Sequence, residues 1–433
     1  MVTAQPPDPT AIPAEDADAA SLSPGEIARV QRRTVRVLSA GQVLGGLAFG
    51  ATVSLGAVLA AEISGDEAFS GLAAAAVTLG TAVFAVPLAS FARRRGRRVS
   101  LATGMALALV GVILVVGAAG AASFPLLLLA FGLVGAGQAV NLQTRFAAAD
   151  LASDTTRGRD LSIVVWATTV GAVLGPNLTG PGEVLGQFVG MPPLTGPYLI
   201  TAGAQLAGIL VYLVALRPDP LLLAQRVVAF ASRSSGARAI VKPDAPTAAR
   251  FAVFAIAAAH GVMVSVMAMT PVHLMHQGAT LTVIGLTISL HIAGMYALSP
   301  VFGVLADRIG RIPVILLGQV LLAASLVTAS LGQDATAAVT VGLILLGLGW
   351  SATTVAGSAL LTEASSEQQR TRRQGFSDLV MSLVGAAGAI LAGFVLAWIG
   401  YGGLALVVGV AVVATVVLAP FGRIPAQTVP ADG

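Results

Sequence analysis

Residues 303–312 read GVLADRIGRI, a short charged segment between two long apolar segments. A weaker copy at 89–98 reads ASFARRRGRR and also lies between apolar segments. This copy keeps a glycine followed by an arginine, at Gly96 and Arg97, but it lacks the leading glycine and the aspartate. Because the same kind of charged loop occurs once in each half of the chain, the sequence predicts two related halves.

The composition indicates that most of the protein surface does not face water. Hydrophobic residues make up 56% of the 433 positions, charged residues make up 10%, and the mean hydropathy is +0.88. These values lie far from those of a soluble globular domain, and the apolar residues are spread over both halves. The lipid bilayer is therefore the expected solvent. The absence of cysteine excludes a disulfide framework and a thiolate metal site.

Long apolar segments predict the fold class. A helix needs roughly 20 mostly apolar residues to cross a hydrocarbon core of about 30 Å. The sequence holds roughly a dozen such segments, which predicts an all-α membrane protein with about twelve transmembrane helices in two six-helix, pseudo-symmetric halves. The predicted spans are 37–61, 68–91, 99–120, 124–147, 161–180, 197–216, 251–271, 281–304, 313–331, 336–361, 377–399 and 402–421.

The positions of the basic residues predict the orientation. Cytoplasmic loops of membrane proteins are enriched in Lys and Arg. All 24 basic residues lie in alternate loops, whereas the opposite loops hold acids such as Glu62, Glu183 and Asp334. We therefore expect a multi-pass protein of the plasma (inner) membrane with both termini in the cytoplasm. The expected segments are a cytoplasmic tail at 1–36, an N-terminal half at 37–216, a cytoplasmic linker at 217–250, a C-terminal half at 251–421 and a cytoplasmic tail at 422–433.

Segment 303–312 matches G-x-L-A-D-R-x-G-R at every specified position, and in this the chain resembles the major facilitator superfamily of transporters. The resemblance covers about 37–421 and implies transport by alternating access. It also implies that the charged loops act as gates that hold one side closed. The expected gate and loop-motif residues, from this resemblance and from the charge argument below, are Arg93, Arg94, Gly96, Arg97, Gly303, Asp307, Arg308, Gly310, Arg311, Asp160 and Asp378.

The first loop departs from the family pattern in its charge. Arg93 replaces the aspartate, and the positive N-terminal end of a facing helix would repel it. The eleventh span carries its own acid, Asp378, so we expect Asp378 to pair with Arg93 or Arg94 when the cytoplasmic side is closed. We expect Asp307 to contact the fifth span, whose start carries Asp160. The alternatives are that Asp378 only caps its helix and that the first loop is only a basic anchor.

The fifth span contains Gly171, Gly175 and Pro176, which resemble the G-x-x-x-G-P signature of the antiporter branch of the same superfamily. The glycines would allow close helix packing, and the proline would permit a bend. The resemblance implies export. Two points stand against it: a kinked packing helix would have the same sequence, and Phe131 replaces the arginine of the fourth-span signature.

Polar side chains within the spans predict the path of the solute, because in hydrocarbon they must face a partner or water. Arg145 would bind an anionic group or hold a cytoplasmic gate with an acid such as Asp150 or Asp160. Arg145 could instead extend its charged end to the cytoplasmic membrane surface. The hydroxyl groups of the tenth span could instead form hydrogen bonds to neighbouring helices. The predicted path residues lie on helix faces of the fourth, seventh, eighth and tenth spans: Gln138, Asn141, Arg145, Trp350, Thr354, Ser358, His260 and His291.

Four histidines lie close together in the seventh and eighth spans. His260 and His291 fall near the middle of successive spans, and we expect them to share a site that carries a proton. Hydrogen-bonded packing is the alternative role for this pair. His273 and His276 have a metal-compatible spacing, but no acid or cysteine accompanies them, so no metal site is expected.

No phosphate loop, metal-ligand helix or nucleophile elbow is present, so we expect neither an enzyme nor a cofactor. The high pI follows from the loop arginines, and no nucleic-acid partner is expected. The leading interpretation is a proton-coupled secondary transporter that exports a drug-like or amphipathic compound. The alternatives are an importer or facilitator of a small, possibly anionic, metabolite and a non-transporting assembly or sensor factor. The sequence leaves the oligomeric state open.

Overall fold

The structure is a computed structural model that describes residues 23–66, 69–234 and 244–424. Most of the predicted terminal tails, at 1–22 and 425–433, and part of the linker lie outside these residues. The helices are α2 (Pro24–Ser64), α3 (Ser70–Gly120), α4 (Phe124–Ala147), α5 (Arg157–Asn177), α6 (Thr179–Phe188), α7 (Gly196–Leu210), α8 (Pro220–Ser234), α9 (Pro246–His276), α10 (Leu281–Tyr296), α11 (Ser299–Ile309), α12 (Arg311–Leu331), α13 (Thr336–Glu363) and α14 (Glu367–Leu418).

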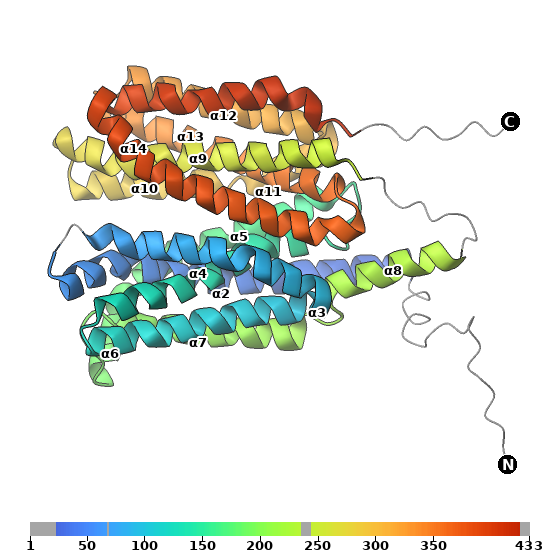
Figure 1. The fold of residues 1–433 in the computed structure, drawn as a ribbon, viewed down its shortest axis with the longest axis horizontal. Coiled ribbons are helices and arrows are strands. Elements are labelled where there is room, and N and C mark those ends of the chain that lie inside the picture. Colours follow the sequence, from blue (N-terminus) through green and yellow to red (C-terminus); the bar gives the residue numbers. More distant parts are fainter. Residues whose placement is uncertain (1–22, 67–68, 235–243, 425–433) are drawn as a thin grey trace, which may run out of the picture.

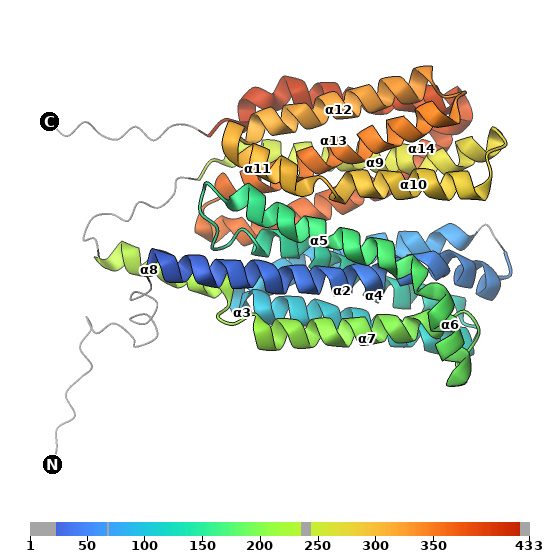
Figure 2. The same cartoon turned by 180° about the vertical axis from the view of Figure 1, so that it is seen from behind.

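The helices form two bundles that lie side by side, α2 to α7 in one and α9 to α14 in the other (Figures 1 and 2). We call them the N-half and the C-half. The described residues form helices and loops without a strand. The predicted fold class, an all-α membrane protein of roughly twelve spans, is confirmed.

Eight helical stretches of the described chain are long and apolar enough to cross a membrane. Two of them, Leu72–Gly120 and Glu367–Gly422, each cover two predicted spans. The first predicted span, 37–61, lies within α2, and the fifth, 161–180, corresponds to α5. The span expected at 124–147 coincides with α4.

The structure differs from the sequence prediction in three helices. The span expected at 281–304 is divided, because α10 ends at Tyr296 and α11 begins at Ser299, next to Pro300. Proline has no backbone N–H and interrupts helical hydrogen bonding there. A separate short helix, α6, precedes α7, and the linker contains α8, whose surrounding prolines and serines had concealed a helical segment.

One glycine makes the turn in each charged loop. Gly96 has φ 85° and ψ 168°, and Gly310 has φ 96° and ψ 163°. This region of backbone conformation is almost confined to glycine. The two loops therefore share one backbone geometry, which supports the internal repeat independently of the side chains.

The halves meet mainly at the end of the molecule that carries the arginine-rich loops, including Arg95, Arg157, Arg308 and Arg372; we call it the basic end. There α14 packs on α3, and α11 packs on α5. Phe146, at the end of α4, inserts into an apolar cluster of the C-half that includes Phe251 and Leu360. In Figure 1, α14 runs obliquely from the C-half toward α3 at this end.

The repeated turn predicts a specific sensitivity to substitution. Gly310→Ala should lower stability by about 1–3 kcal/mol, because alanine is strained at this φ and ψ. The cause is the backbone alone, since an added Cβ would have only Pro313 within 4 Å, at 3.7 Å. Thermal unfolding in detergent measures the effect.

Gly285→Ala is the matched control, because Gly285 is helical and a Cβ there would meet nothing within 4 Å. It should be neutral or stabilising. Equal unfolding temperatures for the two variants would contradict the assigned geometry of the turn.

Candidate functional site

The second charged loop docks its aspartate on a helix of the other half. Asp307 accepts hydrogen bonds from the backbone N–H groups of Gly158 at 2.9 Å and Arg159 at 2.8 Å. These residues form the first turn of α5, where a helix attracts negative charge. The close approach requires small residues, because an added Cβ on Gly158 would lie 2.5 Å from the Gly303 carbonyl oxygen.

Arg311 connects this loop to three further groups. Its guanidinium donates to Asp307 at 2.6 Å and to Glu363 at 3.2 Å, both in the C-half. It also donates to the backbone carbonyl of Asp154 at 2.8 Å, which belongs to the N-half. Arg311 therefore joins the two halves at the basic end.

The first charged loop repeats this arrangement with different partners. Arg97 is fully buried and makes a bidentate ion pair with Asp150 at 2.8 and 3.2 Å. The same guanidinium donates to Gln374 of α14 at 2.7 Å, and Gln374 donates to Thr362 at 3.3 Å. Each loop arginine thus pairs with an acid of its own half and reaches across to the other half.

The position of Asp378 corrects two expectations. Its carboxylate Oδ1 accepts a hydrogen bond from Arg145 Nη2 at 2.6 Å, and the two side chains are 0% and 3% exposed. The expected pairing of Asp378 with Arg93 or Arg94 was wrong for this conformation, because those arginines are exposed at the loop while Asp378 is buried three turns into α14.

The expected partners of Arg145 were wrong for a related reason. Asp150 is already paired with Arg97. Asp160 pairs with Arg159 at 2.8 Å and accepts from Gln31 at 2.8 Å, so it is satisfied within the N-half.

Several buried polar atoms around this ion pair have no hydrogen-bond partner among the described residues. They include Nε of Arg145 and Oδ2 of Asp378. On α13 the hydroxyls of Ser351, Thr354 and Ser358 are also buried and unpartnered. Thr362, one turn further, donates instead to the carbonyl of Ser358 at 3.0 Å. A buried polar atom without a partner costs free energy, so this region is suited to groups that acquire partners in another state.

Three aromatic side chains form a cluster, which we call the aromatic cluster: His260, Tyr296 and Trp350. Trp350 Nε1 donates to Nδ1 of His260 at 3.1 Å, and Tyr296 meets the Trp350 ring edge-on with centroids 5.8 Å apart. His260 and Tyr296 are half-buried, and the charge of Arg145 acts on both. Because Nδ1 of His260 accepts a hydrogen bond, this imidazole is neutral here.

His291 does not join this cluster. Its ring is buried, and Nδ1 donates to the carbonyl of Leu343 at 2.8 Å, while Nε2 has no partner among the described residues. Leu343 and Trp350 lie about two turns, roughly 10 Å, apart along α13. The two histidines therefore contact different stretches of α13, and their sharing of one site stays a prediction.

An amide cluster lies in the N-half, between α2 and α4. Asn141 donates to Gln138 at 2.8 Å, and Gln42 of α2 donates to the Asn141 carbonyl at 3.2 Å. Both Gln138 and Asn141 are half-buried near the middle of α4. The sequence prediction missed Gln42 and Tyr296. A polar or hydroxyl-bearing side chain inside a predicted span was the available signal for both.

The remaining predicted motifs have structural contacts. Gly171 packs α5 on α2, because an added Cβ would lie 2.6 Å from Cα of Gly46. The helix α5 continues through Gly175 and Pro176, and the surroundings of these two residues lie outside the described part. His273 stacks on Tyr401 with ring centroids 4.2 Å apart, at the end opposite the basic end. Within the described residues no group of histidines and acids could hold a metal ion.

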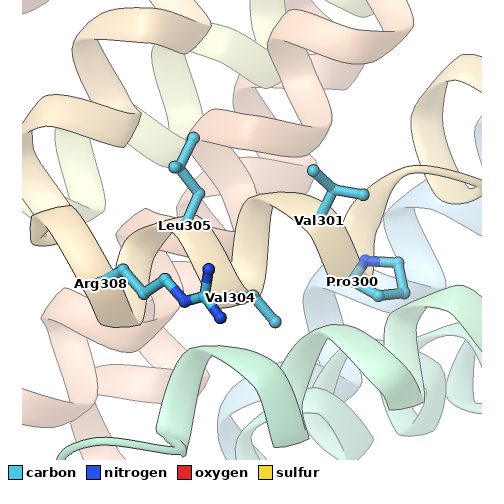
Figure 3. Close-up of a pocket in the computed structure, with 5 residues that line it drawn as sticks. All are labelled: Pro300, Val301, Val304, Leu305 and Arg308. Carbon is cyan, nitrogen blue, oxygen red and sulfur yellow. The ribbon is translucent and has the colours of Figure 1, made fainter.

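A surface groove of about 420 Å³ runs along α11 (Figure 3). Its lining is apolar apart from Arg308 at one end, and the residues are Pro300, Val301, Val304, Leu305 and Arg308. None of the polar residues of α4 or α13 contributes to it. The groove is therefore separate from the candidate solute path.

Comparison with known proteins identifies relatives over nearly the whole chain. The family model described as Major Facilitator Superfamily matches residues 38–278 and 251–431. Two Bacillus subtilis proteins named uncharacterized MFS-type transporters, YdeG and YddS, are 37% and 35% identical. The YdeG match covers 93% of this chain and 96% of the relative, and the YddS match covers 88% of each. The riboflavin transporter RfnT of Brucella anthropi is 30% identical over 85% of this chain and 90% of the relative.

Solved structures share the fold at low sequence identity. The human organic anion transporter MFSD10 (TETRAN) has a TM-score of 0.73 at 16% identity, over 90% of this chain and 99% of that one. The E. coli fucose:proton symporter FucP has a TM-score of 0.61 at 16% identity, over 90% of this chain and 98% of that one.

The contact between α14 and α3 predicts how the basic end can be forced apart. Gly375 faces Ala89, and an added Cβ would lie 3.1 Å from the carbonyl of Ala85. Gly375→Val should therefore separate the helices and raise the rate of thiol labelling at a cysteine introduced at the buried Ser377 by about tenfold or more. The native chain has no cysteine to interfere.

Gly393→Val on the same helix is the control, because a Cβ there meets nothing within 4 Å. It should leave the labelling rate unchanged. Similar rates in both variants would show that the contact of Gly375 does not keep the basic end closed.

Proposed function

The chain belongs to the major facilitator superfamily, and from this premise we propose that it exports a small amphipathic solute by proton-coupled alternating access. The resemblance of Gly171, Gly175 and Pro176 to the antiporter signature supports export. The aromatic cluster supports an amphipathic solute, because aromatic rings offer apolar faces and polar edges.

The observation that carries this proposal is the distribution of contacts between the halves. Among the described residues, the hydrogen bonds that cross between the halves gather toward the basic end, where Asp307, Arg311, Arg97 and Arg145 each reach a partner in the other half. Ser299 of α11 also donates to the carbonyl of Ser162, in the second turn of α5. Contacts gathered at one end suit a conformation closed at that end. We further propose that the basic end faces the cytoplasm, since arginine-rich short loops favour that side.

The solute would bind between the halves. Its proposed contacts are the amide cluster of α4 on one side and the aromatic cluster on the other, with Arg145 between them at the closed end. Inward-facing polar groups on central helices are the usual basis of a midplane site in secondary transporters. The groups near the proposed site that can exchange a proton are His260, His291 and Asp378.

Uptake of a planar metabolite is the second candidate function. Two observations favour it: the relative named a riboflavin transporter, and the edge-on contact of the Trp350 and Tyr296 rings, whose faces can stack on a heterocycle. Arg145 adds a charge that suits an anionic group on the solute.

Transport by purified protein in sealed vesicles separates these candidates. With riboflavin and the amphipathic dye ethidium as probes, an imposed pH gradient should drive one of them against its concentration gradient. The direction of the driven flux relative to the proton gradient distinguishes exchange from co-transport. Trp350→Leu should lower the flux about tenfold or more, because it removes the ring that contacts His260 and Tyr296.

Trp398→Leu is the matched control, because Trp398 is 84% exposed on α14, and its flux should equal that of the unmodified protein. Gradient-independent flux of both probes would contradict proton coupling. Equal losses in the two tryptophan variants would remove the aromatic cluster from the solute path.

A further inference from the structure

We propose that Asp378 is the proton-binding residue that controls the basic end, and that its protonation releases Arg145 and opens that end. The inference rests on the proposed alternating-access function. It assigns the proton to a carboxylate at the contact between the halves instead of to the histidines.

The first step is that this ion pair must break during transport. Arg145 belongs to α4 of the N-half, and Asp378 belongs to α14 of the C-half. Their hydrogen bond is 2.6 Å long at the closed end. If the halves separate there, the two groups separate with them.

The other ion pairs do not share this property. Arg97 and Asp150 both lie in the N-half, and Arg311 pairs with Asp307 and Glu363 within the C-half. Among the pairs whose two partners are both described, Arg145 and Asp378 form the one that joins the halves. Opening therefore leaves this carboxylate without its counter-ion.

The second step concerns the charge that remains. A carboxylate with 0% exposure is destabilising once its partner is removed, unless water or a proton compensates its charge. Oδ2 of Asp378 already lacks a hydrogen-bond partner, and so does Nε of Arg145. Protonation cancels the charge and gives the carboxyl group a donor, so it removes the cost of separation.

The neighbouring groups do not offer Asp378 a substitute partner. The charges that act on it come from Arg145 of α4 and Arg97 of α3, and Arg97 is already bound to Asp150 and Gln374. From α9 the nearest titratable group along the contact with α14 is His260, whose ring lies at Gly385, about two turns away. The charged residues Glu363 of α13 and Arg311 of α12 bind each other at the loop.

The sign of the pH effect follows from these states. The closed state holds the ionised carboxylate, and the open state binds one more proton, so lower pH shifts the population toward the open state. One linked proton changes the equilibrium by at most about tenfold per pH unit. The effect is separate from solute binding and can be measured without a solute.

The test measures the distance between spin labels across the basic end in the full-length protein in lipid nanodiscs. Labels are placed on cysteines introduced at Arg95 and Gln368, which are exposed, one in each half. When the pH is lowered from about 8.5 to about 5.5, the fraction of molecules with a long distance between the labels should grow. The ratio of open to closed molecules should rise by at most about tenfold per pH unit, as expected for one linked proton. Asp378→Asn, which resembles the protonated form, should show the long distance at both pH values.

Two further variants keep the proposal falsifiable if Asp378→Asn folds poorly. Exchanging the pair, as Arg145→Asp with Asp378→Arg, should restore the short distance at high pH and its loss at low pH. His260→Gln should retain the pH response of the unmodified protein.

A full pH response in Asp378→Asn, or its loss in His260→Gln, would overturn the assignment. If the labels respond to pH as expected but no probe is transported in vesicles, the proposed function fails while the proton site stands. If transport is coupled to protons but the label distances do not change with pH, the proton site fails and the function stands.

Discussion

The fold depends on the requirement that backbone N–H and C=O groups inside a bilayer find partners within their own helix. Once the backbone N–H and C=O groups of a helix are hydrogen-bonded within that helix, contacts between helices depend mainly on side chains. Between the two halves, the described contacts include small residues that permit close approach, such as Gly158 and Gly375, the apolar side chain of Phe146, and polar side chains that reach the other half, such as Arg97 and Arg311. A few residues at the basic end therefore determine whether the two bundles stay in contact there.

The contacts between the halves near the two charged loops differ in their electrostatics. In the second loop Asp307 binds the N-terminal turn of α5, whose partial positive charge is fixed by the backbone and cannot titrate. In the first loop the acid is absent, and Asp378 on the facing helix pairs with Arg145. One contact is a constant attraction, whereas the other is between two ionised side chains, one of which can accept a proton. The repeat is symmetric in backbone geometry and asymmetric in chemistry.

Apolar length and the loop motif were enough to predict the helical fold and its two halves, because both signals are local. The partner of Asp378 was not predictable in this way. Its predicted partners, Arg93 and Arg94, were neighbours in the motif, but the turn at Gly96 leaves them exposed while Arg97 points inward. Arg145 lies 233 positions away in the chain, and only helix packing brings it to α14. The role of the predicted solute-path residues stays a prediction.

The unpartnered hydroxyls on α13 explain how a change as small as one proton can matter. Each buried polar atom without a partner costs about 1–3 kcal/mol, and Ser351, Thr354 and Ser358 carry this cost in the closed state. Opening to water would supply them with partners, which offsets part of the packing lost between α14 and α3. Where such opposing terms nearly cancel, the difference between the two states is small compared with either term. A shift of about 1.4 kcal/mol per pH unit from a single carboxyl group is large enough to decide which state predominates.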